Sequence, residues 1–177
     1  MSRSVTRKAI EQFAQALGAR LAAPADLYLI GGAALLLVGN SRATQDIDIV
    51  GSDAPPDDDP WRIAVARTTS ELRLDVEAVP FDAFVPRLKG GEGRHRLVGT
   101  FGNVRLWVFD PVAIALSKLD RGFETDFYDI MFLLRQGIVT RQQLLDAIEE
   151  ATPRAHSFDL DIARMRRRLV ALLSALE

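Results

Sequence analysis

The sequence predicts an α/β N-terminal half followed by a helical C-terminal half. Short apolar runs of strand length stop near residue 110, and only segments with helical spacing of apolar residues follow. The chain has 177 residues, which is enough to bury a substantial core. We therefore expect an α/β domain over residues 1–110 and a helical part over residues 111–177 that packs on it.

The N-terminal half contains signals for helices and strands in alternation. Apolar residues at helical spacing between Ile10 and Leu21 predict the first helix. The later segment from Leu72 to Val79 alternates strictly, as a strand does. In order, we predict a helix at 5–21, a strand at 26–31, a helix at 32–38, a strand at 45–50, a loop at 51–60, a helix at 61–71, a strand at 72–79, and a hairpin at 96–109 that turns at Gly102-Asn103.

The C-terminal half begins with a helix-capping signal. Asp110 can cap a helix with Pro111 at its first position, and this helix should run to about Gly122. Thr140 caps a later helix in the same way. The remaining helices are predicted at 124–136, 140–151 and 159–176.

Composition excludes several classes of site and location. The chain has no cysteine, so disulfides, thiolate metal sites and a cysteine nucleophile are excluded. Its two histidines, His95 and His156, are too few and too far apart to suggest a zinc site. The sequence shows no signal peptide core and no membrane-length apolar run, so we expect a cytoplasmic protein with no membrane contact. The net charge of −2 means that any nucleic-acid affinity must come from local patches.

Two aspartates stand in an otherwise apolar predicted strand. Asp46 and Asp48 should project from the same face, with Cα atoms about 6.6 Å apart. Carboxylates this close repel unless a cation neutralises them, and Mg²⁺ prefers such oxygen ligands. Asp75 or Glu77, on one face of the alternating strand, could complete a two-metal site. The alternative interpretation is a solvated polar face on an edge strand.

Two glycines stand where the first strand would turn into a helix. At such a turn, backbone N–H groups can hold a phosphate, and Gly31 and Gly32 impose no side chain in its way. Close packing of the helix against the strand would explain the same glycines.

These motifs together resemble a known superfamily. The segments "IGG" at 30–32, "DIDI" at 46–49 and "LDV" at 74–76 resemble the nucleotidyltransferase superfamily that includes DNA polymerase β. The segments "GGAALLLVGNSRATQDID" and "PVAIALSKLDRGFETDFYDIMFLL" look like bacterial AbiEii-like and DUF6036-type nucleotidyltransferases, several of which are toxins of toxin–antitoxin systems. The resemblance covers about residues 27–136. It implies a nucleotidyltransferase fold with a short mixed β-sheet flanked by helices, in which residues 1–110 are catalytic and the helical part packs on the active site.

The resemblance assigns the acidic residues. It implies that Asp46 and Asp48 are metal ligands and that Asp75 is the third carboxylate, which also activates the attacking hydroxyl. Strand register decides between Asp75 and Glu77, so both stay open.

The resemblance also assigns the residues that would bind phosphate. Gly31 and Gly32 would hold the triphosphate through the backbone, although Gly32 lacks the hydroxyl of the serine that many relatives carry. Arg42 and Thr44 match an "R-x-T-x-D" lead-in, in which Arg42 would contact phosphate. The alternative for Arg42 is an ordinary exposed loop arginine.

In the C-terminal half, the resemblance points to a lysine and two acids. Lys118 would approach the nucleotide phosphates, and Arg121 shares its flank of the predicted helix. Asp126 and Asp129 match a "D-x-x-D" position at which one acid is needed. The alternatives are a surface lysine on an amphipathic helix and ion pairs of the two acids with Lys118 or Arg121.

The expected activity is transfer of a nucleoside monophosphate from an NTP to an acceptor hydroxyl, with Mg²⁺ or Mn²⁺ as cofactor. The toxin-like resemblance implies tRNA or another RNA as acceptor and a cognate antitoxin as partner. The alternatives are transfer to a small molecule or a protein side chain, and a non-catalytic nucleotide-binding module of the same fold.

Two basic segments complete the sequence-based predictions. The run at 164–168 lies on an amphipathic helix, so most of its charge should be a solvated face, with RNA phosphate or an acidic antitoxin as alternative ligands. The glycine-rich loop at 87–96 is expected to be a flexible connector rather than a mobile lid.

Overall fold

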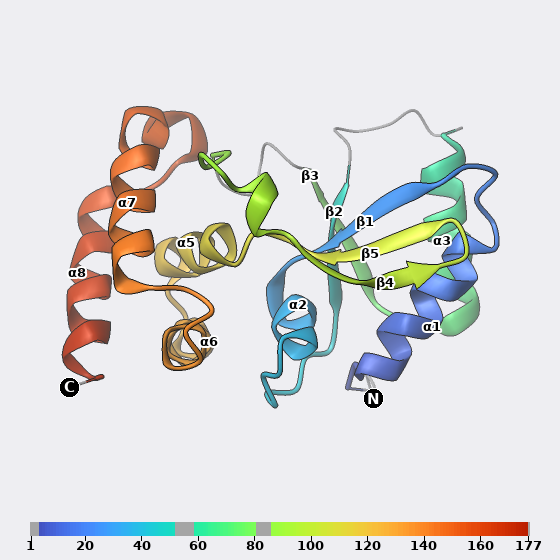
Figure 1. Cartoon of the computed structure of the whole chain (residues 1–177), viewed down its shortest axis with the longest axis horizontal. Coiled ribbons are helices and arrows are strands. Elements are labelled where there is room, and N and C mark those ends of the chain that lie inside the picture. Colours follow the sequence, from blue (N-terminus) through green and yellow to red (C-terminus); the bar gives the residue numbers. More distant parts are fainter. Residues whose placement is uncertain (1–3, 52–58, 81–85, 177) are drawn as a thin grey trace. The chain divides into compact units, whose positions relative to one another are not determined.

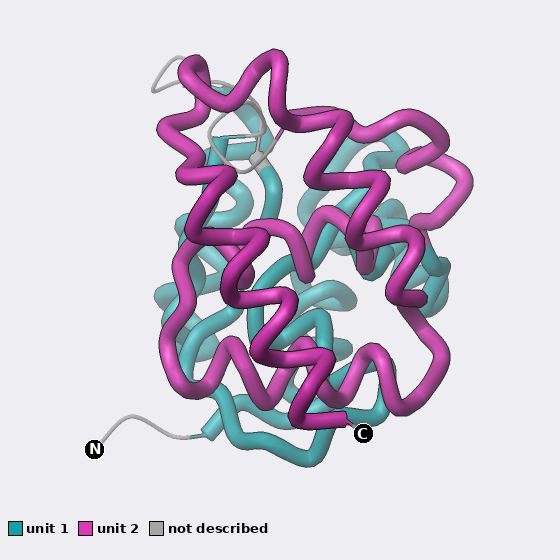
Figure 2. Tube along the Cα trace, turned by 90° about the vertical axis from the view of Figure 1, so that its left-hand side faces the viewer, with its two compact units in different colours: residues 1–81, 96–109 teal, residues 82–95, 110–177 magenta. Residues whose placement is uncertain are grey.

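The computed structural model describes residues 4–51, 59–80 and 86–176. The chain divides into two compact units, shown in different colours in Figure 2. Unit 1 comprises Met1–Phe81 and Arg96–Phe109, and unit 2 comprises Asp82–His95 and Asp110–Glu177.

Unit 1 contains a five-stranded mixed sheet, which confirms the predicted α/β class with a short mixed sheet and flanking helices (Figure 1). The strand order is β3-β2-β1-β5-β4. Strand β1 runs parallel to β5 and β2 runs parallel to β3, whereas the β1–β2 and β4–β5 pairs are antiparallel. The elements are α1 (Arg7–Gly18), β1 (Ala25–Leu29), α2 (Gly31–Leu37), β2 (Ile47–Gly51), α3 (Pro60–Leu72), β3 (Val76–Pro80), β4 (Arg96–Phe101) and β5 (Val104–Val108).

The core of unit 1 lies between α1 and one face of the sheet. Helix α1 is amphipathic and contacts β4 and β5, because its apolar residues recur at helical spacing. Strand side chains alternate between the two faces, so each strand gives every second residue to this core. The fully buried members are Ile10, Phe13 and Leu17 of α1 and Leu27, Leu29, Ile47, Ile49 and Leu106 of the sheet.

Unit 2 is built from helices, as predicted for the C-terminal half. Asp110 accepts a hydrogen bond from the backbone N–H of Val112 and Thr140 accepts one from Gln143, so both predicted caps are present. Helix α5 is buried on most of its surface and contacts α6, α7 and α8, whereas α7 and α8 each bury one apolar stripe. The elements are η1 (Glu92–Arg94), α5 (Pro111–Arg121), α6 (Glu124–Arg135), α7 (Arg141–Ala151), η2 (Thr152–Phe158) and α8 (Ile162–Ser174).

The glycine-rich segment before β4 is held by polar contacts within unit 2. Arg94 donates two hydrogen bonds to the buried carboxylate of Asp110, at 2.8 and 2.6 Å. The backbone N–H of Lys89 donates to Glu150 at 2.6 Å, and Arg154 donates to the backbone carbonyl of Arg87 at 2.8 Å. A segment expected to be a flexible connector therefore has specific partners at both of its ends.

Several element boundaries differ from the sequence prediction, among them the end of α1, which lies at Gly18 rather than at residue 21. Strand β2 begins at Ile47, so Asp46 lies immediately before it. Helix α3 continues to Leu72, where Arg73 adopts a left-handed conformation with φ of 51° and ends the helix, so β3 starts only at Val76. Helix α8 starts at Ile162, after its cap Asp161. Most of the predicted loop at 51–60 lies outside the described residues.

Among the described residues, no helix is both long enough and apolar enough to cross a bilayer.

Candidate active site

The two aspartates of the "DIDI" segment lie at the start of β2. Asp48 is inside the strand and half-buried, while Asp46 precedes the strand and is exposed. The hydroxyl of Thr44 donates to a carboxylate oxygen of Asp46 at 2.9 Å. Thr44 is itself fixed, because its carbonyl accepts a hydrogen bond from the backbone N–H of Val5 at 2.8 Å. The position of the Asp46 carboxylate is therefore set by Thr44.

The two glycines lie directly against this acidic segment. Gly31 has a positive φ of 62°, and a Cβ added there would meet a carboxylate oxygen of Asp48 at 2.1 Å. At Gly32, an added Cβ would meet the hydroxyl oxygen of Thr44 at 2.7 Å and a guanidinium nitrogen of Arg42 at 3.5 Å. Only glycine avoids both the steric overlap and the backbone strain at Gly31. The fold thus brings together Gly31, Gly32, Arg42, Thr44, Asp46 and Asp48, which are six of the predicted site residues.

The register of the parallel pair β2–β3 positions both candidates for the third carboxylate. Asp48 is the direct partner of Glu77, so their side chains leave the same face of the sheet on adjacent strands, about 4.8 Å apart at the Cα atoms. Asp75 precedes β3, and its carbonyl accepts a hydrogen bond from the N–H of Ile47 at 2.8 Å. Both Asp75 and Glu77 are exposed. The register therefore favours Glu77 as the neighbour of Asp48.

The donor set suits a hard divalent cation. Mg²⁺ and Mn²⁺ prefer carboxylate oxygens and keep several water ligands, so solvent-accessible acids on one sheet face match their chemistry. Among the described residues, however, no three acidic or histidine side chains are close enough together to hold a metal ion.

The predicted residues of unit 2 form a buried ion-pair cluster. The ammonium of Lys118 donates to Asp126 at 3.0 Å and to Asp129 at 2.8 Å, and the side chain of Lys118 is only 3% exposed. Arg121 donates two hydrogen bonds to Asp126, at 2.8 and 2.5 Å, while its own side chain stays 53% exposed. Of the two alternatives for Asp126 and Asp129, ion pairs with Lys118 and Arg121 are present. Lys118 is not a surface lysine.

The charge of Asp126 is stabilised by its partners. Burial alone would raise the pKa of Asp126, but hydrogen bonds from Arg121 and Lys118 outweigh it, and the pKa lies below its ordinary value. The backbone N–H of Phe123 donates to the same carboxylate at 3.1 Å. Asp126 therefore connects the end of α5 to the first turn of α6.

This lowered pKa makes the stability of unit 2 depend on pH. The contribution of Asp126 is complete above its unfolded pKa of about 3.9 and is lost as the pH falls through the lower pKa of the folded state. We expect the free energy of unfolding to fall below about pH 4, and to fall less steeply in Arg121→Gln, which lacks one lowering partner. Urea unfolding across this range measures both slopes. Identical slopes in the two proteins would contradict the assignment.

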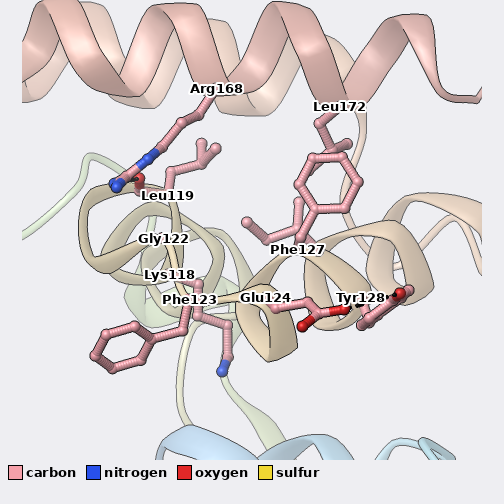
Figure 3. A pocket seen from close by; sticks show the side chains of 10 residues that line it. Lys118, Leu119, Gly122, Phe123, Glu124, Phe127, Tyr128, Arg168 and Leu172 are labelled. Carbon is pink, nitrogen blue, oxygen red and sulfur yellow. Dashed lines mark hydrogen bonds between the residues drawn. The ribbon is translucent and has the colours of Figure 1, made fainter.

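A cavity of about 330 Å³ lies beside this cluster, between α5, α6 and α8 (Figure 3). Phe127 and Leu172 line the cavity, and Figure 3 shows their side chains next to each other. Gly122 lets α8 approach, because a Cβ there would meet the guanidinium carbon of Arg168 at 2.0 Å. Arg168 donates to the carbonyl oxygens of Leu119 and Asp120 at the end of α5. The cavity therefore lies at the packing contact of α5 with α8.

Sequence reasoning missed a second group of residues in unit 1. Asp26 and Tyr28 of β1 are the direct partners of Arg105 and Trp107 of β5, on the sheet face that also carries Asp48. The signal was present as polar and aromatic residues at every second position of "DLYL" and "VRLWV". Sequence alone could not pair the two strands.

Comparison with known proteins identifies the family of this chain. Residues 7–144 match the family described as "Nucleotidyltransferase of unknown function (DUF6036)". The chain belongs to this nucleotidyltransferase family. The match covers the acidic segment, the two glycines and the ion-pair cluster of this nucleotidyltransferase, and it confirms the family resemblance stated from the sequence. No curated protein and no solved structure matches the chain.

Proposed function

We propose that this nucleotidyltransferase moves a nucleoside monophosphate from an NTP to an acceptor hydroxyl at the site formed by Gly31, Asp46 and Asp48. The observation that carries the proposal is the contact of Gly31 with the Asp48 carboxylate, because it places an open backbone segment against two accessible acids. Backbone N–H groups bind phosphate and carboxylates bind the accompanying cation, so a metal–nucleotide complex fits both.

Each residue has a role in this proposal. The backbone of Gly31 and Gly32 holds the triphosphate, and Arg42, whose guanidinium lies beside Gly32, contacts a phosphate oxygen. Asp46, oriented by Thr44, and Asp48 hold Mg²⁺ or Mn²⁺ with a third carboxylate from β3. The bound cation would neutralise charge on the phosphates during transfer.

The bond changes follow from nucleotidyl transfer. The acceptor oxygen bonds to the α-phosphorus, and the bond from that phosphorus to the bridging oxygen of the β-phosphate breaks. The electron pair leaves with pyrophosphate, and the hydroxyl proton passes to the third carboxylate. Most of the rate enhancement would come from positioning and from electrostatic stabilisation.

Lys118, Arg121 and Asp129 have a structural role in this proposal. The ammonium of Lys118 is enclosed by two carboxylates, and breaking either pair to reach a phosphate would leave a buried charge without its partner. Arg121 and Asp129 belong to the same network.

For the acceptor, we propose RNA, with a tRNA 3′ end as the first candidate and a toxin role restrained by an antitoxin. The support is the resemblance of residues 27–136 to AbiEii-like and DUF6036-type enzymes. The net charge of −2 means that RNA binding would depend on local groups rather than on the whole surface.

Labelled nucleotides test the proposal directly. We expect purified protein with Mg²⁺ and one α-labelled NTP to label a band in total bacterial RNA, and Asp46→Ala/Asp48→Ala to leave it unlabelled. The double variant is a fair control because Asp46 is exposed and Asp48 half-buried, so the fold should persist. Labelling of protein or of a small molecule instead would identify a different acceptor. No labelling of any acceptor, with folded protein and all four NTPs, would contradict the transfer itself.

A further inference from the structure

One face of the sheet in unit 1 carries an ordered aromatic surface. Tyr28 and Trp107 lie side by side on β1 and β5, with ring centroids 6.2 Å apart and planes 23° apart. Leu97 of β4, the direct partner of Trp107, is 54% exposed on the same face. We call the two rings of Tyr28 and Trp107, together with the neighbouring apolar side chain of Leu97, the aromatic shelf.

The orientation of Trp107 is fixed by two charged residues, Asp26 and Arg105. The indole N–H of Trp107 donates to one carboxylate oxygen of Asp26 at 2.7 Å, and Arg105 donates to the other oxygen at 2.7 Å. The Arg105 side chain remains 51% exposed. Trp107 is therefore held in one orientation beside a solvent-accessible cation, rather than packed in the core.

The shelf is continuous with the candidate active site. Tyr28 is the direct partner of Val50, which lies two residues after Asp48 on the same face of β2. The shelf therefore begins about 7 Å along the strand from Asp48. Gly31 lies on the other side of Asp48, beyond the end of β1.

The geometry of nucleotidyl transfer indicates from which side of Asp48 the acceptor arrives. This inference rests on the function proposed above. The attacking and leaving oxygens stand roughly in line across the α-phosphorus. If the triphosphate lies over Gly31 and Gly32, pyrophosphate leaves on that side of Asp48. The acceptor then arrives from the opposite side, along the sheet face that carries the shelf.

We propose that the aromatic shelf stacks a nucleobase of a single-stranded RNA acceptor and presents its hydroxyl to the site at Asp48. Tyr28 and Trp107 are half-buried, so each keeps part of its ring exposed. Exposed aromatic rings are suited to unpaired bases, whereas the bases of a duplex are already stacked on one another. Arg105 adds a cation within reach of the RNA backbone. Stacking on Tyr28 and Trp107 favours an acceptor with a planar ring.

The fluorescence of Trp107 reports on this stacking. The chain has two tryptophans, so Trp61→Phe leaves Trp107 as the only one. We expect a short single-stranded RNA to quench this fluorescence in a saturable way, and an abasic sugar–phosphate oligomer of equal length to leave it unchanged. Equal quenching by both oligomers, or none by either, would overturn the proposal.

Variants of the shelf give a second readout that does not depend on fluorescence. Labelled RNA should bind Trp107→Leu and Tyr28→Leu about tenfold more weakly, whereas Trp107→Phe, which keeps a ring, should bind within about threefold of the original protein. Circular dichroism melts identify any variant that fails to fold, and Tyr28→Leu keeps the bond between Trp107 and Asp26 intact. Unchanged RNA affinity in both folded leucine variants would overturn the proposal.

The two proposals fail in distinguishable ways. RNA labelling by the original protein, with Trp107 unaffected by RNA, would refute the shelf and leave the transfer standing. Base-dependent quenching without labelling from any NTP would support the shelf as an RNA-binding surface and refute the transfer.

Discussion

Glu77→Gln is expected to reduce nucleotide transfer about a thousandfold, whereas Asp75→Asn should reduce it by less than about tenfold. The reason is the register of β2 and β3, which makes Glu77 the direct partner of Asp48, while Asp75 precedes β3. A glutamine at position 77 keeps the size of the side chain but loses the charge that would bind a cation and the basicity that would accept a proton in the proposed site. Initial rates with labelled NTP and acceptor measure the effect.

The two variants form a matched pair. Both acids are exposed and neighbour the same strand, so both substitutions should leave the melting temperature nearly unchanged. Loss of transfer in Asp75→Asn with activity retained in Glu77→Gln would reverse the assignment and restore the aspartate that the resemblance implies. Full activity in both variants would remove β3 from the proposed site.

Lys118→Met is expected to lower the free energy of unfolding by about 3–5 kcal/mol. The substitution removes the cation that both Asp126 and Asp129 contact and leaves two fully buried carboxylates short of a partner. A loss of this size corresponds to a fall of about 10 °C in melting temperature for a chain of this length. Thermal and urea unfolding measure it.

Compensating substitutions identify the cause. In Lys118→Met/Asp126→Asn/Asp129→Asn, the unpaired negative charges are gone, so part of the lost stability should return even though more residues differ. A loss below about 1 kcal/mol in Lys118→Met would show that the ion pairs add little, and would make Lys118 available for contact with a nucleotide.

Particular residues show which parts of the fold could be predicted from the sequence. The helix signals were local: Asp110 with Pro111, and Thr140, cap the helices that they predicted. The strand boundary near Asp75 was misplaced, because α3 continues to Leu72, the left-handed Arg73 ends it there, and the strand starts only at Val76. Alternation in the sequence continues through that turn and cannot show where the backbone changes conformation.

In the candidate site, too, some features could be predicted from the local sequence and others could not. The sequence singled out Gly31, Gly32, Asp46 and Asp48 because glycines at a turn and acids in an apolar run are unusual in themselves. It chose Asp75 as the third carboxylate with Glu77 as the open alternative, and it left open whether Asp126 and Asp129 meet Lys118. Those choices depend on strand register and on helix packing, neither of which is a local property.

By itself, then, the sequence determined the α/β class, the nucleotidyltransferase resemblance and the residue types of the site, because these follow from local spacing and chemistry. Only the tertiary structure placed Glu77 opposite Asp48, enclosed Lys118 between two carboxylates, and set Tyr28 beside Trp107. The physical reason is that these contacts join residues far apart in the chain. Their partners are chosen by the burial of the whole apolar core rather than by any short stretch of residues.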